Sequence, residues 1–113
     1  MQPFSRIERI ADLIHKEIAV MLRTEAFDPR FVDVTVLSVK VAPDLSQARI
    51  FFALLDATKV KETTKALNKA AGFLRTGLAK AAKLRRTPAL VFVYDEIFAR
   101  GQHLSDLIDS VND

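Results

Sequence analysis

The first stretch of the chain carries apolar residues at intervals of three and four. They are Ile7, Ile10, Ile14, Ile18, Met21 and Leu22. This spacing puts them on one side of an α-helix, with charged residues on the other side. Ser5-Arg6-Ile7-Glu8 is a capping box that favours a helix start, and proline in Asp28-Pro29-Arg30 cannot continue a helix. The pattern predicts a helix over residues 6–25.

Two strand-like stretches follow. Residues 34–41, VTVLSVKV, are rich in β-branched side chains, and residues 49–55, RIFFALL, are aromatic and aliphatic. Their connection is too short for a parallel crossover, so the strands should pair antiparallel. Alternation predicts two core-facing sets: Leu37, Val39 and Val41 on the first strand, and Ile50, Phe52 and Leu54 on the second.

Helical spacing returns after Asp56, a suitable N-cap, and persists as far as Thr87-Pro88. This stretch is long for one globular helix. Gly72 lies near its middle, so we expect two helices that meet at a bend. Residues 90–94, LVFVY, predict a third strand, and the apolar positions after it predict a helical C-terminal extension over 96–113.

The order of these elements indicates an α+β fold: helix, two strands, helix, bend, helix, strand and a short C-terminal helix. Each predicted helix has a single apolar side. The helices should therefore cover one face of a three-stranded sheet. We expect residues 1–113 to form a single domain without repeats or a linker.

Composition narrows the classes of function. The chain has no cysteine, which excludes disulfide scaffolds, thiolate metal sites and cysteine nucleophiles. The apolar run Ile50–Leu55 is far shorter than the about 20 residues of a membrane span. The first residues do not resemble a secretory signal. We expect a cytoplasmic protein that does not bind membranes.

Positive charge is concentrated in one segment. The chain has a formal net charge of +3, but residues 57–88 hold nine basic side chains against Glu62 alone, a net of +8. Opposite the apolar side of the predicted helices fall Lys61, Lys65, Lys69, Lys80 and Lys83, with Arg75 beside them. Solvated helix faces usually alternate Lys with Glu. The uncompensated charge therefore indicates an anionic partner, and nucleic acid is the favoured one.

The mode of binding follows from the residue types. Lysine outnumbers arginine on this face, which favours contacts with phosphates over reading of base edges. Base stacking is not expected, because the aromatic residues occupy core-like positions: Phe51, Phe52, Phe73, Phe92 and Tyr94.

Catalytic chemistry is not indicated. His15 and His103 fall in different predicted elements and match no metal-ligand spacing, so both are interpreted as surface or cap-proximal residues. Asp95 and Glu96 stand at a predicted helix start, where acids are expected from the helix dipole. The glycines form no phosphate-binding loop. We expect no enzymatic activity, metal, cofactor or small-molecule substrate.

Several segments taken together resemble the bacterial ribosome-binding factor A family. They are Asp28-Pro29-Arg30, Val41–Leu45, Leu67–Arg75, Leu84–Pro88 and Phe92–Glu96. The similarity spans nearly the whole chain, and its most specific block is Ala-Ala-Gly-Phe-Leu-Arg. The resemblance implies a type II KH-like domain whose Gly-x-x-Gly loop is replaced by an Ala-x-Gly bend, here Ala70, Ala71 and Gly72. Glycine at 72 would tolerate backbone angles that alanine resists.

The resemblance also implies a function. Members of the family are non-enzymatic factors that bind the small ribosomal subunit and its 16S rRNA, assist late maturation and 5′-end processing, and support growth in the cold. The implied RNA-facing residues are Lys65, Lys69, Arg75, Lys80, Lys83, Arg85 and Arg86, to which the charge pattern adds Lys61. We expect a monomer.

Other classes of protein remain alternatives. The nearest is a generic KH-like RNA-binding module without ribosome specificity. A processing nuclease would need carboxylates or histidines clustered around a metal, whereas the basic face has only Glu62. A protein-interaction domain would need an apolar surface beyond those used for packing.

Overall fold

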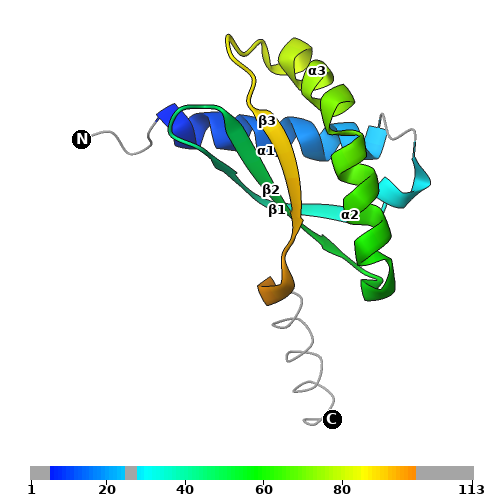
Figure 1. Cartoon of the computed structure of the whole chain (residues 1–113). Coiled ribbons are helices and arrows are strands. Elements are labelled where there is room, and N and C mark those ends of the chain that lie inside the picture. The colour runs from blue at the N-terminus through cyan, green and yellow to red at the C-terminus, as the bar shows by residue number, and fades with distance from the viewer. Residues whose placement is uncertain (1–5, 25–27, 99–113) are drawn as a thin grey trace.

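The structure, a computed structural model, describes residues 6–24 and 28–98. Its elements, in which η marks a short 3₁₀ helix, are α1 (Arg6–Thr24), η1 (Pro29–Phe31), β1 (Val34–Val41), β2 (Gln47–Leu54), η2 (Ala57–Lys59), α2 (Val60–Lys69), α3 (Ala71–Ala82) and β3 (Ala89–Tyr94) (Figure 1). This order confirms the predicted α+β fold. Ser5 of the capping box and most of the predicted 96–113 extension lie outside the described residues.

The three strands form one mixed sheet in the order β1-β2-β3. β1 and β2 pair antiparallel, as their short connection predicts. β2 and β3 pair parallel, with Ile50 opposite Phe92. The connection between β2 and β3 contains α2 and α3, which gives the long crossover that a parallel pair requires.

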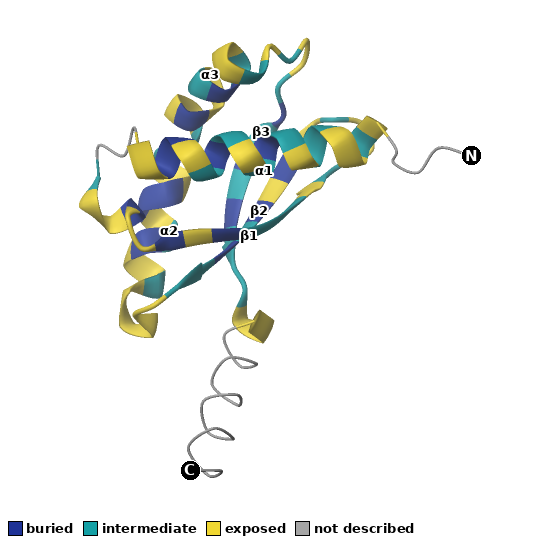
Figure 2. Ribbon diagram, turned by 180° about the vertical axis from the view of Figure 1, so that it is seen from behind, coloured by how far each residue is buried: buried dark blue, intermediate teal, exposed yellow. Residues whose placement is uncertain are grey.

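The helices cover one face of the sheet. α1 contacts β1, whereas α2 and α3 contact β3. In Figure 1, α1 lies behind the strands, and after a half turn in Figure 2 it lies in front of them. The buried residues join all three α-helices, η1 and the sheet in one cluster, in which Phe31, Phe52 and Phe92 are the largest fully buried side chains. The predicted layer arrangement is confirmed.

The core-facing residues of β1 differ from the prediction in the first part of the strand. Val34 and Val36 are buried, and the register with β2 shifts between Val36 and Ser38. Leu37 is the extra residue of this β-bulge and does not belong to the core. Val39 and Val41, farther along the strand, pack against the core. A bulge reverses the alternation of the residues that follow it. Simple alternation therefore assigned Leu37 to the wrong side.

His15 connects α1 to this irregular part of β1. Its Nε2 atom lies 3.1 Å from the carbonyl oxygen of Val36, beside the bulge, and the side chain is half-buried. The interpretation of His15 as a surface or cap-proximal residue is wrong, because the residue lies half-buried in the middle of α1. With a proton on Nε2, the imidazole donates to a backbone carbonyl and helps to hold α1 on the sheet.

Candidate nucleic-acid interface

The first half of the basic segment folds into η2 and α2. Asp56 caps its start as predicted: Oδ1 accepts the Thr58 N–H at 3.0 Å and the Thr58 hydroxyl at 2.6 Å. The hydrogen bonds from Thr58 lower the pKa of the Asp56 carboxyl. α2 then turns Thr63, Ala66 and Leu67 into the core. Burial of these three residues determines which side of α2 is left for solvent.

The solvent side of α2 carries the lysine stripe, defined as Lys61, Lys65 and Lys69. All three are exposed, and their spacing of four residues aligns them along one side of the helix. Within residues 6–24 and 28–98 none of them forms an ion pair. The structure thus brings together these three predicted site residues as a row of uncompensated positive charge.

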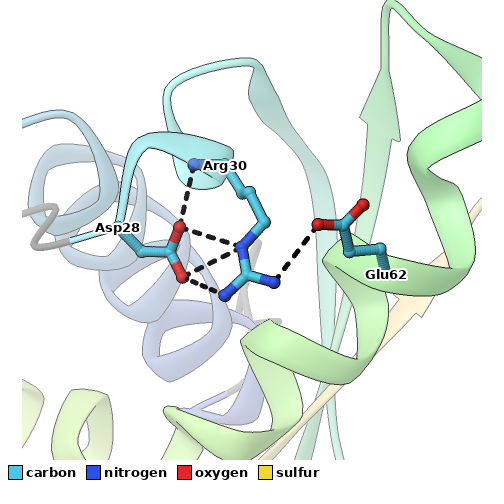
Figure 3. A network of polar contacts seen from close by, with 3 residues as sticks. All are labelled: Asp28, Arg30 and Glu62. Carbon is cyan, nitrogen blue, oxygen red and sulfur yellow. Dashed lines mark hydrogen bonds and ion pairs between the residues drawn. The ribbon is translucent and has the colours of Figure 1, made fainter.

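Glu62, the single acid of residues 57–88, is directed away from the lysine stripe. Its Oε1 lies 3.5 Å from Nη1 of Arg30, whose Nη2 lies 2.6 Å from Oδ2 of Asp28 (Figure 3). The side-chain hydrogen bond from Arg30 is the main cause of the lowered pKa of Asp28. Arg30 of η1 therefore forms an ion pair with Glu62, the one carboxylate of residues 57–88 that could have paired with the lysines.

The break between α2 and α3 lies at Ala70. Its N–H donates to the carbonyl oxygens of Ala66 and Leu67, at 3.0 and 3.1 Å, and its own carbonyl accepts the Leu74 N–H at 3.0 Å to start α3. The bend therefore falls within the predicted Ala70–Gly72. Figure 1 shows the two helices following one another along one side of the molecule.

Gly72 was predicted to adopt backbone angles that alanine resists, and this prediction is wrong. No described glycine has a positive φ, so Gly72 does not adopt a conformation that alanine resists. Gly72 lies in the first turn of α3. A Cβ added there would meet no atom within 4 Å. Its contacts within the described part of the chain do not require glycine.

The remaining basic residues lie on α3 and in the loop that follows. Leu74 and Leu78 face the core and Lys80 is exposed. Lys83 does not continue the helical stripe as predicted, because it caps α3 in the left-handed conformation with φ 52°. Arg85 and Arg86 are exposed in the loop. The site residues thus form two groups, one along α2 and one around the C-terminal end of α3.

Arg75, one of the predicted arginines, also has a hydrogen-bond partner within the protein. Arg75 donates from Nε and Nη2 to the carbonyl oxygen of Thr87, at 3.0 and 2.7 Å, and so anchors the loop before β3. Arg86 forms no ion pair with a described residue; its charge adds only a minor effect to the lowered pKa of Asp44, whose main cause is the side-chain hydrogen bond from Ser46. This contact makes Arg75 more constrained than the exposed lysines of the predicted set.

Sequence reasoning missed the aromatic residues at the surface. Phe73 is 60% exposed. Phe51 is half-buried on the side of β2 opposite the core, with Lys40 and Arg49 next to its ring. Assignment of both to core-like positions was wrong. For Phe51, strict alternation with the buried Ile50 and Phe52 was the signal that could have identified it.

The described residues show no group of three or more His, Asp or Glu side chains that could hold a metal ion. No described helix is long and apolar enough to span a bilayer.

The fold and this surface define an α+β domain of element order α-β-β-α-α-β, with positive charge concentrated on a helix pair. The sequence model of the family described as ribosome-binding factor A matches residues 6–108. A ribosome-binding factor A of Coxiella burnetii is 46% identical over 104 residues, which cover 92% of this chain and 87% of that protein. The chain belongs to the ribosome-binding factor A family, whose members are non-enzymatic.

A crystal structure and a homology model fitted into a cryo-EM map agree with this assignment. The crystal structure of ribosome-binding factor A from Thermus thermophilus has a TM-score of 0.70 at 22% identity, over 80% of this chain and 97% of that one. A homology model of the Thermus thermophilus factor, fitted into a cryo-EM map of a 30S complex, has a TM-score of 0.56 at 26% identity, over 74% and 92% of the two chains. The first supports the fold alone.

Proposed function

We propose that this chain binds the 30S small ribosomal subunit, contacting 16S rRNA through the lysine stripe of α2 and the basic residues at the end of α3. The observation that carries the proposal is the row of Lys61, Lys65 and Lys69, exposed and without ion pairs in the described part of the chain. Such a row of uncompensated positive charge favours a polyanion such as folded RNA over a neutral partner. The related Thermus factor in complex with the 30S subunit supports the same partner.

The proposed activity is assistance in late maturation of the subunit, including 5′-end processing of its rRNA and growth in the cold. A binding protein shifts an RNA folding equilibrium only by the difference in its affinity for the two states. The factor therefore stabilises an rRNA conformation of the immature subunit and leaves when that conformation is lost. The factor acts as a cytoplasmic monomer of one domain without a cofactor.

Sedimentation of a cell extract through a sucrose gradient tests the partner. The protein should migrate with free small subunits and be absent from complete ribosomes. The triple variant Lys61→Gln/Lys65→Gln/Lys69→Gln should remain at the top of the gradient. The matched control Arg9→Gln/Lys16→Gln/Arg23→Gln removes three exposed charges from α1 and should migrate like the wild type. Migration of the wild type away from small subunits would contradict the proposal.

The alternative function, a generic KH-like RNA-binding module, gives a different result in competition. Such a module would be displaced from small subunits by an equal mass of unrelated folded RNA.

The proposed maturation role is tested separately in cells that lack the protein. They should accumulate 16S rRNA with an extended 5′ end, most strongly at low temperature, and the α1 variant but not the α2 variant should restore processing.

A further inference from the structure

The sheet has a second face, opposite the helices, that carries a distinct set of side chains. Ile50, Phe52 and Phe92 point into the core. Because neighbouring residues of a strand alternate, Arg49 and Phe51 lie on the other face. The three described α-helices contribute to the core cluster on the first face. The second face is therefore not covered by any of them.

Two cations adjoin an aromatic ring on this open face. Lys40 of β1 is directly opposite Arg49 of β2 in the antiparallel register. Lys40 Nζ lies 5.9 Å, and Arg49 Cζ 6.0 Å, from the centroid of the Phe51 ring. Neither cation forms an ion pair within residues 6–24 and 28–98. Like charges that face each other across two strands destabilise a sheet, so an anion bound between them would relieve a local repulsion.

The ring of Phe51 borders an open hollow of about 570 Å³. In the register of the sheet, Lys40 lies level with Arg49 and Val91, toward one end of the hollow, and Asp95 and Glu96 follow β3 at the other end. The wall between these ends includes Ser38 and Val93. This volume is within the range of about 300–1,000 Å³ that is usual for small-ligand sites. The hollow is therefore large enough for a nucleotide and has a positive end, an aromatic wall and an acidic end.

We propose that this face binds one unstacked nucleotide of single-stranded RNA. The base stacks on Phe51 and displaces the Lys40 and Arg49 side chains from over its ring, so that they contact its phosphate. Oδ1 of Asp95 accepts the Phe98 N–H at 3.0 Å, and Oδ2 accepts a hydrogen bond from an exocyclic amino group of the base. Aromatic side chains stack on any base, whereas carboxylates accept from the amino group of cytosine. The face therefore prefers cytosine or adenine to uracil, which has no amino group. This site is separate from the lysine stripe and does not depend on it.

Fluorescence anisotropy with labelled hexanucleotides of C, A or U tests the site. The measurements use the Lys61→Gln/Lys65→Gln/Lys69→Gln protein, in which the lysine stripe contributes little, so that this site is tested apart from the proposed docking of the small subunit. We expect the C and A hexamers to bind more tightly than the U hexamer or a duplex. Phe51→Leu, which keeps an apolar side chain, should weaken binding of the C hexamer at least about tenfold.

A second variant keeps the test independent of any loss of folding at position 51. Lys40→Gln/Arg49→Gln changes only exposed side chains and should also weaken binding of the C hexamer. Arg9→Gln/Lys16→Gln removes the same amount of charge from α1 and should leave the affinity within about twofold. The proposal is overturned if Phe51→Leu and the double variant both bind like their parent. It is also overturned if a duplex binds as tightly as the hexamers, or if an acidic peptide displaces them at equal concentration.

Discussion

The side-chain amide of Asn68 exchanges two hydrogen bonds with the backbone of Phe92. Asn68 Nδ2 donates to the Phe92 carbonyl oxygen at 3.1 Å, and the Phe92 N–H donates to Asn68 Oδ1 at 2.9 Å. Because β3 is an edge strand, the amide supplies the pairing that a further strand would give at that point. The contact fixes the last turn of α2, and with it Lys65 and Lys69, relative to the sheet.

Replacement of this amide by a carboxylate tests the contact. Asn68→Asp retains the acceptor for the Phe92 N–H but places a carboxylate oxygen against the Phe92 carbonyl. We expect the free energy of unfolding at pH 7 to fall by about 1–3 kcal/mol, measured by urea denaturation. Below a pH of about 4 the introduced carboxyl group becomes protonated and regains a donor, so the difference from wild type should narrow. An unchanged stability at pH 7 would show that the amide does not hold α2 on the sheet.

The two glycines of α3 should respond differently to alanine. Gly72 has open space where alanine would place its methyl group, whereas a Cβ at Gly77 would overlap the terminal methyl of the buried Met21. Alanine is favoured over glycine inside helices by about 1 kcal/mol. Gly72→Ala should therefore raise the unfolding free energy by about 0.5–1 kcal/mol.

At Gly77 the gain in unfolding free energy from the helix propensity of alanine is offset, because the end of the Met21 side chain must move. Thermal unfolding of both variants should give a higher midpoint for Gly72→Ala than for Gly77→Ala. The opposite order, or a loss of stability in Gly72→Ala, would mean that the bend does require glycine.

Local periodicity was sufficient to predict most of the fold. The stripe from Ile10 to Leu22 identified α1, and β-branched and aromatic runs identified the strands. The lysine stripe was predictable for the same reason: the positions of Lys61, Lys65 and Lys69 depend only on the helix period once Leu67 is assigned to the core.

Features that depend on contacts distant in sequence were not predictable. The bulge at Leu37 depends on register with β2. Arg75 meets the carbonyl of Thr87 only after the chain has turned back toward β3. Each of these features requires the tertiary arrangement, which single-sequence patterns do not contain.

Three aspartates should make the protein less stable in acid. Asp28, Asp44 and Asp56 each accept hydrogen bonds from a residue two positions later, mainly from Arg30, Ser46 and Thr58 side chains, which lower their pKa values. A carboxyl whose pKa is lower in the folded than in the unfolded state stabilises the fold above the unfolded pKa, about 3.9 for aspartate. That contribution is lost as the pH falls through the folded pKa.

Asp56→Asn isolates one of these contributions. Asparagine also caps helices well, so the variant should retain most of its stability at pH 7. Its unfolding free energy, measured by denaturant between about pH 6 and pH 2.5, should fall less steeply than that of the wild type. Parallel profiles for the two proteins would exclude a role of the Asp56 cap in acid sensitivity.

The salt dependence of binding to purified small subunits tests most directly whether the lysine stripe docks on RNA. If about five lysines neutralise phosphates, log affinity should fall with log salt at a slope of about −3.5 to −4.5. The Lys61→Gln/Lys65→Gln/Lys69→Gln protein should bind more weakly, with a slope shallower by about 2 to 3. The α1 control Arg9→Gln/Lys16→Gln/Arg23→Gln should retain the wild-type slope. Equal slopes for the wild type and the α2 variant would contradict the account.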